Sequence, residues 1–268
     1  MEEPSRHNTE ESAQGFHDVS EGPVAFAEEK NERLQHSFSK KVGKAIFDYN
    51  MIDEGDRILV AVSGGKDSLA LLNILHSRLS FSPIRYSVIA VHVDLGYQCV
   101  HPKILETYFA RYGYEYKIVT VDILEGGCKS RKDISCFWCS WNKRKAVFET
   151  AKALSCNKVA FGHHKDDIAE TILMNMFFNS EISGMNPKQV LFNGELTLIR
   201  PLAYIDESEV AAFARTQAFP EHVCSCPNHA TTRRNEAAKV IQMIEKSCPE
   251  VRTNIVGSLK RIKKDYIL

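Results

Sequence analysis

Short apolar runs alternate with amphipathic segments along most of this 268-residue chain, and this alternation constrains the fold more than any other feature. The runs are β-branched in part and closed by turn residues, as in buried strands of a parallel sheet. The segments between them repeat apolar residues at helical spacing. The sequence therefore predicts an α/β fold, a doubly wound parallel sheet with right-handed crossovers. The expected strands are 57–63, 85–94, 116–123, 157–164 and 196–202, and the expected helices are 34–50, 66–79, 102–113, 139–155, 166–179 and 206–217.

The N-terminal segment differs from the rest in charge and in apolar content. Residues 1–35 hold nine acidic and three basic residues, so the remainder carries a formal charge of +6 in a chain that is neutral overall. We predict a disordered acidic tail over 1–33, because it has few large apolar side chains, and one domain over 34–268 that includes C-terminal helices. A basic body suits a polyanionic partner.

The same composition bears on location. No apolar run has the length that a membrane span needs, and the N-terminus lacks the basic start and apolar core of a secretory signal. We therefore expect a cytoplasmic protein with no membrane partner.

A glycine-rich loop, "SGGKDS", closes the strand 57–63 and opens the next helix. Ligands of doubly wound sheets bind at this end of the strands. Glycines let the backbone approach an anion, while amides, hydroxyls and a lysine hold phosphate oxygens. The spacing excludes a Walker A loop, and the three-glycine dinucleotide fingerprint is absent. We expect a phosphate site made of Ser63, Gly64, Gly65, Lys66, Asp67 and Ser68.

A second signature, "GHHKDDIAET", spans residues 162–171. Gly162 allows a close backbone approach where a strand ends. Asp166 and Asp167 begin the following helix, where its dipole favours carboxylates. Paired carboxylates beside a triphosphate are natural Mg²⁺ ligands, although plain helix capping by Asp166 is the alternative.

Cysteines provide the third signal. Cys136 and Cys139 form "CFWC" just before a predicted helix, and this spacing lets both thiolates face one metal. The segment "HVCSCPNH" adds Cys224 and Cys226. Composition alone leaves a structural zinc site and an iron–sulfur cluster equally open. We expect ordinary roles for the isolated Cys99, Cys128, Cys156 and Cys248.

Basic and aromatic residues follow the cysteine pair. Lys143, Arg144 and Lys145 could hold a nucleic-acid backbone. Trp138 and Trp141 could stack on a splayed base, although core packing is the favoured interpretation.

These strings resemble those of a known family. "SGGKDS" matches the PP-loop motif of the N-type ATP pyrophosphatases, and "GHHKDDIAET" resembles the second motif of PP-loop enzymes that act on tRNA. Residues 136–179, "GMNPK" 184–188, "LIRPLAY" 198–204 and "AFP" 218–220 are similar to the TtcA-type tRNA 2-thiocytidine synthetases of bacteria. The similarity extends over roughly residues 35–260.

The resemblance implies a reaction and its participants. ATP is split between its α- and β-phosphates, the C2 oxygen of cytidine 32 in the anticodon loop is adenylated, and sulfur then replaces it to give 2-thiocytidine. ATP and Mg²⁺ are the implied cofactors, tRNA is the substrate, and a sulfur donor such as a cysteine desulfurase is a partner. Related enzymes are often homodimers, which this sequence allows without demanding it. The implied catalytic residues are Lys66, Asp67, Asp166 and Asp167, and Asp94 and Gly162 join the loop in binding ATP.

The resemblance also implies a [4Fe-4S] cluster with three cysteine ligands and an open fourth iron that can carry the incoming sulfur. Cys136 and Cys139 match the pair, and Cys224 is the expected third ligand. The family has Cys-x-x-Cys where this chain has Cys-x-Cys, so Cys226 could be the third ligand instead, a fourth ligand or a sulfur carrier.

Three other functions share parts of this pattern. A tRNA uridine thiolase usually carries an N-terminal zinc ribbon, but residues 1–98 contain no cysteine. A lysidine synthetase needs no cysteine pair. A non-catalytic nucleotide-binding iron–sulfur or zinc sensor is disfavoured because Lys66, Asp67 and both signature aspartates are present.

Overall fold

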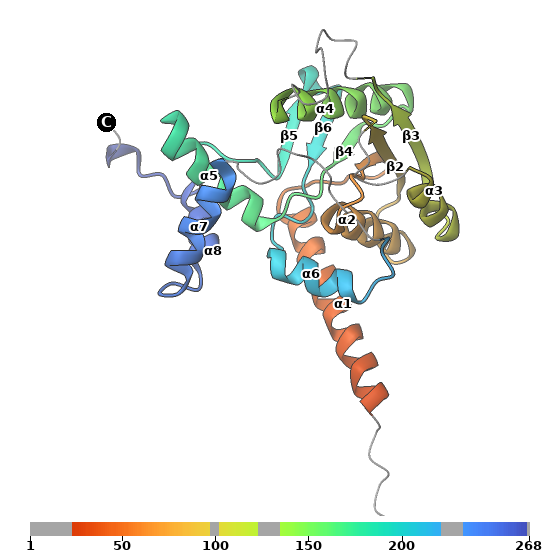
Figure 1. Ribbon diagram of the computed structural model, residues 1–268, viewed down its shortest axis with the longest axis horizontal. Helices are drawn as coiled ribbons and strands as arrows, with labels where there is room; N and C mark the ends of the chain where they lie inside the picture. The colour runs from red at the N-terminus through yellow and green to blue at the C-terminus, as the bar shows by residue number, and fades with distance from the viewer. Residues whose placement is uncertain (1–22, 97–101, 123–134, 221–232, 267–268) are drawn as a thin grey trace, which may run out of the picture.

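A six-stranded sheet in the order β3-β2-β1-β4-β6-β5 forms the centre of the protein (Figure 1). The computed structural model describes residues 23–96, 102–122, 135–220 and 233–266. Neighbouring strands pair in parallel except at the edge, where β5 runs antiparallel to β6. The predicted α/β doubly wound sheet is therefore confirmed. The strands are β1 Asp56–Ala61, β2 Tyr86–Asp94, β3 Glu115–Thr120, β4 Lys158–Ala160, β5 Lys188–Leu191 and β6 Leu196–Ile199.

Strand β5 has no counterpart among the sequence predictions. Its four residues, "KQVL", are only partly buried or exposed, so the segment lacks the apolar run by which buried strands are recognised. A short 3₁₀ turn, η3 (Phe192–Gly194), joins it to β6. Phe192, Asn193 and Gly194 all have positive φ there, which makes the reversal tight.

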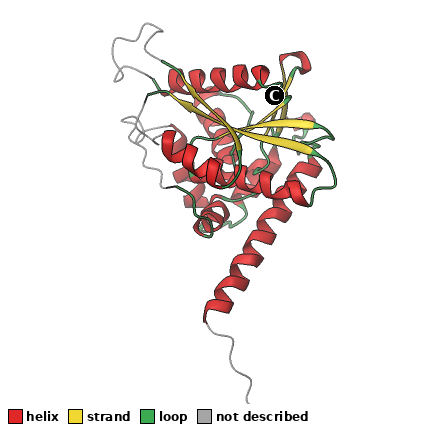
Figure 2. Cartoon of the chain, turned by 90° about the vertical axis from the view of Figure 1, so that its right-hand side faces the viewer, coloured by secondary structure: helices red, strands yellow, loops and turns green. Residues whose placement is uncertain are grey.

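Helices cover both faces of the sheet, as the side view in Figure 2 shows. One hydrophobic cluster joins β1 and β2 to α1, α2, α3 and α6, and a second cluster joins the opposite face to α4. Helices α5, α7 and α8 pack together beside the sheet (Figure 1). The bounds are α1 Pro23–Asp48, α2 Lys66–Ser77, α3 Pro102–Arg111, α4 Cys136–Ala153, α5 Lys165–Asn179, α6 Glu207–Arg215, α7 Arg233–Glu245 and α8 Val251–Ser258.

Helix α1 begins at Pro23, well before the boundary at residue 34 that the sequence suggests. The helix therefore extends into the segment that the sequence predicts as an acidic tail, and residues 1–22 lie outside the described part. Proline suits the first turn of a helix, and the alanine, glutamate and lysine residues that follow are good helix formers. Phe38 then anchors the helix by stacking on Phe213 of α6, with ring centroids 4.3 Å apart.

Helix α6, which lies within the predicted helix 206–217, begins with a capping box. Asp206 is its N-cap, and the Asp206 amide donates to the Glu209 carboxylate at 3.1 Å. Among the described helices, none is both long and apolar enough to cross a membrane.

Candidate functional site

The glycine-rich loop lies between β1 and α2 and is ordered by its own serines. The Ser63 amide donates to the Ser68 hydroxyl at 3.1 Å, and that hydroxyl donates to the Gly65 carbonyl at 2.9 Å. The Gly65 amide donates to the Ser63 hydroxyl at 3.3 Å. Gly64 has a φ of 91°, which explains glycine at that position. The loop is thus closed before α2 begins at Lys66.

Gly162 follows β4 and touches the start of α2. A Cβ on Gly162 would lie 2.9 Å from the carbonyl carbon and oxygen of Asp67 and 3.0 Å from the Ser68 nitrogen. The predicted close approach is therefore present, and its partner is the backbone that follows the glycine loop. The two signatures of the sequence are in direct contact.

A cavity of about 760 Å³ opens at the carboxyl ends of β1, β2 and β4, a volume in the range of small-molecule sites. Ser63, Asp67 and Ser68 line it from the loop side, and Gly162, His163 and Asp167 from the second signature. Helix α4 forms a further wall through Ser140, Lys143, Arg144, Val147 and Phe148, and Arg200 and Arg234 complete the positive lining.

Asp166 and Asp167 do not share this cavity. Successive helical residues point about 100° apart, so only Asp167 faces it. Asp166 lines a separate hollow of about 460 Å³ between α5, α6 and α8. Its oxygens accept a hydrogen bond from the Glu207 amide at 2.7 Å and pair with Arg252. Asp67, rather than Asp166, therefore lies with Asp167 in the cavity wall, and the predicted Mg²⁺ pair of Asp166 and Asp167 is not brought together there. The assignment of Mg²⁺ ligands stays a prediction.

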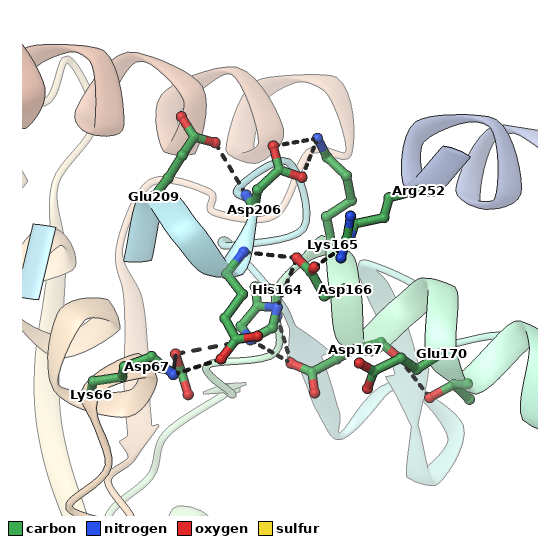
Figure 3. Close-up of polar contacts among 12 residues, drawn as sticks. Lys66, Asp67, His164, Lys165, Asp166, Asp167, Glu170, Asp206, Glu209 and Arg252 are labelled. Atoms are coloured by element: carbon green, nitrogen blue, oxygen red, sulfur yellow. Dashed lines mark hydrogen bonds and ion pairs between the residues drawn. The ribbon is translucent and has the colours of Figure 1, made fainter. Parts of the chain in front are cut away.

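His164 lies buried among these three carboxylates (Figure 3). Its Nε2 is 3.4 Å from an Asp167 oxygen and 3.9 Å from an Asp67 oxygen, and its Nδ1 is 3.5 Å from Asp166. Burial lowers the pKa of His164, but the neighbouring carboxylates outweigh it and raise the pKa above its ordinary value. A protonated His164 thus offsets the repulsion among the aspartates.

Asp166 belongs to the same buried network. Burial raises its pKa, but hydrogen bonds from His164 and the Glu207 amide lower it to about 2 overall. Asp166 is therefore ionised, and its contacts join α5 to α6 and α8.

Lys66 lies between two carboxylates (Figure 3). Its Nζ is 3.1 Å from Glu207 Oε1 and 3.3 Å from Asp67 Oδ1. Burial lowers the pKa of Lys66, but Asp67 and Glu207 raise it above its ordinary value overall. The sequence analysis did not identify Glu207 as a partner, because it is 141 residues away and no local pattern marks it.

A neutral histidine and two arginines also line the cavity. Burial lowers the pKa of His163 to about 4, so its Nδ1 accepts a hydrogen bond from Arg200 Nε at 3.2 Å. Arg234 of α7 donates to Asp167 at 2.9 Å and to Thr171 at 3.2 Å. Neither arginine was predicted to belong to the site: Arg200 lies within "LIRPLAY", a string used only for the family resemblance, and Arg234 lies in none of the quoted strings.

Glu170 is a further titratable group beside the cavity. Its carboxylate lies 3.9 Å from Arg234, and burial raises its pKa to about 7. Glu170 belongs to the second signature, but the local sequence there does not indicate that its side chain is buried.

Asp94, which the resemblance assigns to ATP binding, takes part in a turn at the end of its strand. It ends β2, and its Oδ1 accepts a hydrogen bond from the Gly96 amide at 2.8 Å, as a strand-end turn residue does. No contact in the described part of the chain brings it to the cavity wall, so its role toward adenosine stays a prediction.

The cysteine pair begins α4, the helix that forms one wall of the cavity. The amide of Trp138 donates to the N-cap Ser135 at 3.1 Å, and Cys139 packs half-buried against the second hydrophobic cluster. The side chain of Cys136 and all of Cys224 and Cys226 lie outside the described residues. The ligand set therefore stays a prediction.

Two of the isolated cysteines have packing roles, as expected. Burial raises the pKa of Cys156, and Cys248 packs beside α5 and α8. Cys99 and Cys128 lie outside the described residues.

Comparison with known proteins identifies the family. A family model described as a PP-loop domain matches residues 31–220. The tRNA-cytidine(32) 2-sulfurtransferase of Syntrophotalea carbinolica is 38% identical over 242 residues, which cover 88% of this chain and 93% of that protein. The protein of the same name from Geobacter sulfurreducens is 38% identical, with 85% and 90% covered. This chain belongs to the PP-loop family of tRNA-cytidine(32) 2-sulfurtransferases.

The fold of this PP-loop protein also matches a solved structure. The U34-tRNA thiolase NcsA from Methanococcus maripaludis, determined with its [4Fe-4S] cluster, superposes with a TM-score of 0.73 over 89% of this chain and 81% of that one. The two are 24% identical, so the likeness concerns the fold.

Helices α7 and α8 of this PP-loop protein lie beyond residue 220, where the family model ends. They nevertheless supply an arginine to each signature aspartate, Arg234 to Asp167 and Arg252 to Asp166. The electrostatics of the second signature therefore depend on the C-terminal helices.

Proposed function

We propose that this protein activates the C2 oxygen of cytidine 32 in tRNA with ATP and replaces that oxygen with sulfur, giving 2-thiocytidine. The relatives named above support the substrate. The observation that carries the proposal is the shared cavity, in which the PP-loop, two carboxylates and a wall of α4 converge. The helix that forms this wall begins with the cysteine pair.

The chemistry explains why a phosphate loop and a thiolation activity belong together. A carbonyl oxygen is a poor leaving group, whereas adenylate is a good one. The base oxygen attacks the α-phosphorus and pyrophosphate leaves, after which the sulfur nucleophile bonds to C2 and AMP leaves with the oxygen. Positive groups beside the phosphates stabilise the charge that develops on the departing pyrophosphate.

Several residues of this chain suit that role. Lys66 is 38% exposed, so its ammonium can turn from Glu207 toward a phosphate. Arg200 is buried and stays charged because its pKa, which burial lowers, is still about 10. Neutral His163 holds the Arg200 guanidinium in place.

Asp67 and Asp167 are the residues that we propose for Mg²⁺. In nucleotide enzymes this ion is commonly held by one or two carboxylates together with substrate phosphates. Asp67 Oδ1 is buried and accepts no hydrogen bond from the described residues, and its ion pair with Lys66 is long at 3.3 Å. A cation could take the place of the Lys66 ammonium when Lys66 turns toward a phosphate. Asp166, paired with Arg252, positions α5 instead of binding the metal.

The [4Fe-4S] cluster remains part of the proposal. Cys136 and Cys139 are one helical turn apart at the start of α4, as two thiolate ligands of one centre require. Cys224 or Cys226 would be the third ligand. When bound, such a cluster supplies an iron that is open to an external ligand. A cysteine desulfurase as sulfur donor, a homodimer and a cytoplasmic location complete the proposal.

Purified protein tests the proposal directly. Incubation with ATP, Mg²⁺, tRNA and a sulfide source should release AMP and pyrophosphate in step with sulfur incorporation. Nucleotide binding without pyrophosphate release would favour the sensor instead. Thiolated uridine in the product would favour the uridine thiolase.

A further inference from the structure

Helix α4 exposes a stripe of large side chains next to the cavity. Phe137, Trp141 and Lys145 are four residues apart, so they share one face of the helix. The exposed fraction is 75% for Phe137 and 43% for Trp141. Exposed aromatic rings gathered on one face are typical of an interaction site. We call these three residues the aromatic face of α4.

The aromatic face borders the cavity. Phe137 lies three residues before Ser140, and Trp141 lies three residues before Arg144, so each pair is adjacent on the helix surface. Ser140 and Arg144 both line the cavity. A group held on the aromatic face is therefore at the rim of the proposed nucleotide site.

The Trp141 ring is held in place before any partner binds. Trp141 stacks on Trp138, with centroids 5.3 Å apart and planes 11° from parallel. Trp138 is itself half-buried against the second hydrophobic cluster. Anchoring of this kind lowers the entropic cost of binding, because little side-chain freedom remains to be lost.

The charge on this helix favours a nucleic acid over a protein. Lys143, Arg144 and Lys145 are consecutive and exposed, and the Lys145 ammonium lies 5.6 Å from the centre of the Trp141 ring. Protein–protein interfaces are depleted in lysine. Unpaired RNA bases, by contrast, stack on aromatic rings while basic side chains hold the adjoining phosphates.

We propose that the aromatic face of α4 stacks an unpaired base of an RNA loop and so holds the loop at the cavity rim. Lys145 moves from the Trp141 ring and from Glu149, whose carboxylate is 3.8 Å from its ammonium, to a neighbouring phosphate. The move costs little because an exposed cation–π contact and an exposed ion pair are each worth at most about 1 kcal/mol. This inference rests on the proposed function, since it deepens the recognition of tRNA.

The two tryptophans of the chain, Trp138 and Trp141, both lie on α4, so intrinsic fluorescence reports on this surface. Titration with a hairpin RNA that has an open loop should quench the fluorescence. A fully paired duplex of the same composition should quench it far less, because its bases are not free to stack.

Variants test the residues by anisotropy of the labelled hairpin. Phe137→Ala and Trp141→Ala should each weaken binding roughly 5- to 100-fold, the cost of one lost base stack, without changing the salt dependence. Phe137→Tyr and Trp141→Phe keep a ring and should retain most of the affinity. Lys145→Ala should reduce the slope of log affinity against log salt by about 1.

Phe81 provides a matched control. It is 59% exposed and Arg78 lies 5.3 Å from its ring centre, but it precedes β2 at the opposite end of the strands. Phe81→Ala should bind the hairpin as the wild type does.

Each failure has a separate meaning. Wild-type affinity in Phe137→Ala and Trp141→Ala would overturn this inference alone. A lower melting temperature with unchanged RNA affinity would also overturn it, by showing that the rings pack within the chain. Failure of the wild type to bind any RNA would overturn the proposed function.

Discussion

Lys66 is the positive side chain of the PP-loop, and two carboxylates keep it charged. Because Asp67 and Glu207 raise its pKa, Lys66 stays protonated throughout the neutral range. In the proposed function, a nucleotide would compete with Glu207 for the Lys66 ammonium. We therefore expect Glu207 to tune the affinity of the loop for phosphate.

Removal of the Lys66 charge should lower the affinity for the nucleotide and leave the stability of the fold unchanged. Lys66→Ala should weaken ATP binding about 10- to 100-fold, the cost of one charge-assisted hydrogen bond, and leave the melting temperature nearly unchanged. Isothermal titration calorimetry measures the affinity. Lys152→Ala, which removes an exposed lysine near Glu195, is the control. Equal ATP affinity in both variants would exclude a phosphate contact by Lys66.

Asp166 should make stability depend on pH. Its pKa falls from 3.8 to about 2 on folding, so its contribution is present above pH 4 and is lost as the pH falls toward 2. The contribution is on the order of 2 kcal/mol. Denaturant unfolding of Asp166→Asn should show a deficit of that order at pH 7 that narrows toward pH 2. The exposed Asp265→Asn should show none, and a pH-independent deficit in Asp166→Asn would contradict the pKa assignment.

At the scale of elements, the contact between the end of β4 and the start of α2 sets the geometry of the site. It brings the second signature against the PP-loop backbone with no room for a side chain at Gly162. The position of the loop therefore depends on a strand about a hundred residues later in the chain.

Gly162→Ala tests this contact. The new methyl group would force the two backbones apart, costing about 1–3 kcal/mol of unfolding free energy and lowering ATP affinity at the same time. Gly257→Ala in α8 is the matched control, because a Cβ there meets nothing within 4 Å. Thermal unfolding and ATP titration of both variants give the answer. Equal melting temperatures and equal ATP affinities in Gly162→Ala and Gly257→Ala would show that β4 does not position the loop.

For the molecule as a whole, local patterns predicted the core of the fold but not its edges. Buried strands such as β1 and β2 can be recognised in the sequence by their apolar runs. Helix α6 can be recognised by its capping residues. The edge strand β5 has no such run, and the early start of α1 was obscured by the acidic composition around it. These features depend on weak or ambiguous local signals.

The candidate site likewise has features that the sequence predicts and features that it does not. The loop and Gly162 could be found because their geometry requires glycine at fixed places. The different surroundings of Asp166 and Asp167 could not be predicted from the sequence. They depend on Arg252 and Arg234, which lie on helices that only the tertiary fold brings to α5. Arg234 is 67 residues from Asp167, a separation at which no periodicity applies.

Mass spectrometry of tRNA nucleosides tests the central claim most directly. A strain that lacks this protein should lose 2-thiocytidine, and the wild-type gene should restore it. Lys66→Ala should restore little, and Cys136→Ala should restore none while the purified variant still binds ATP. Cys248→Ala should restore it fully. Unchanged 2-thiocytidine in the deletion strain, or full restoration by Cys136→Ala, would contradict the account.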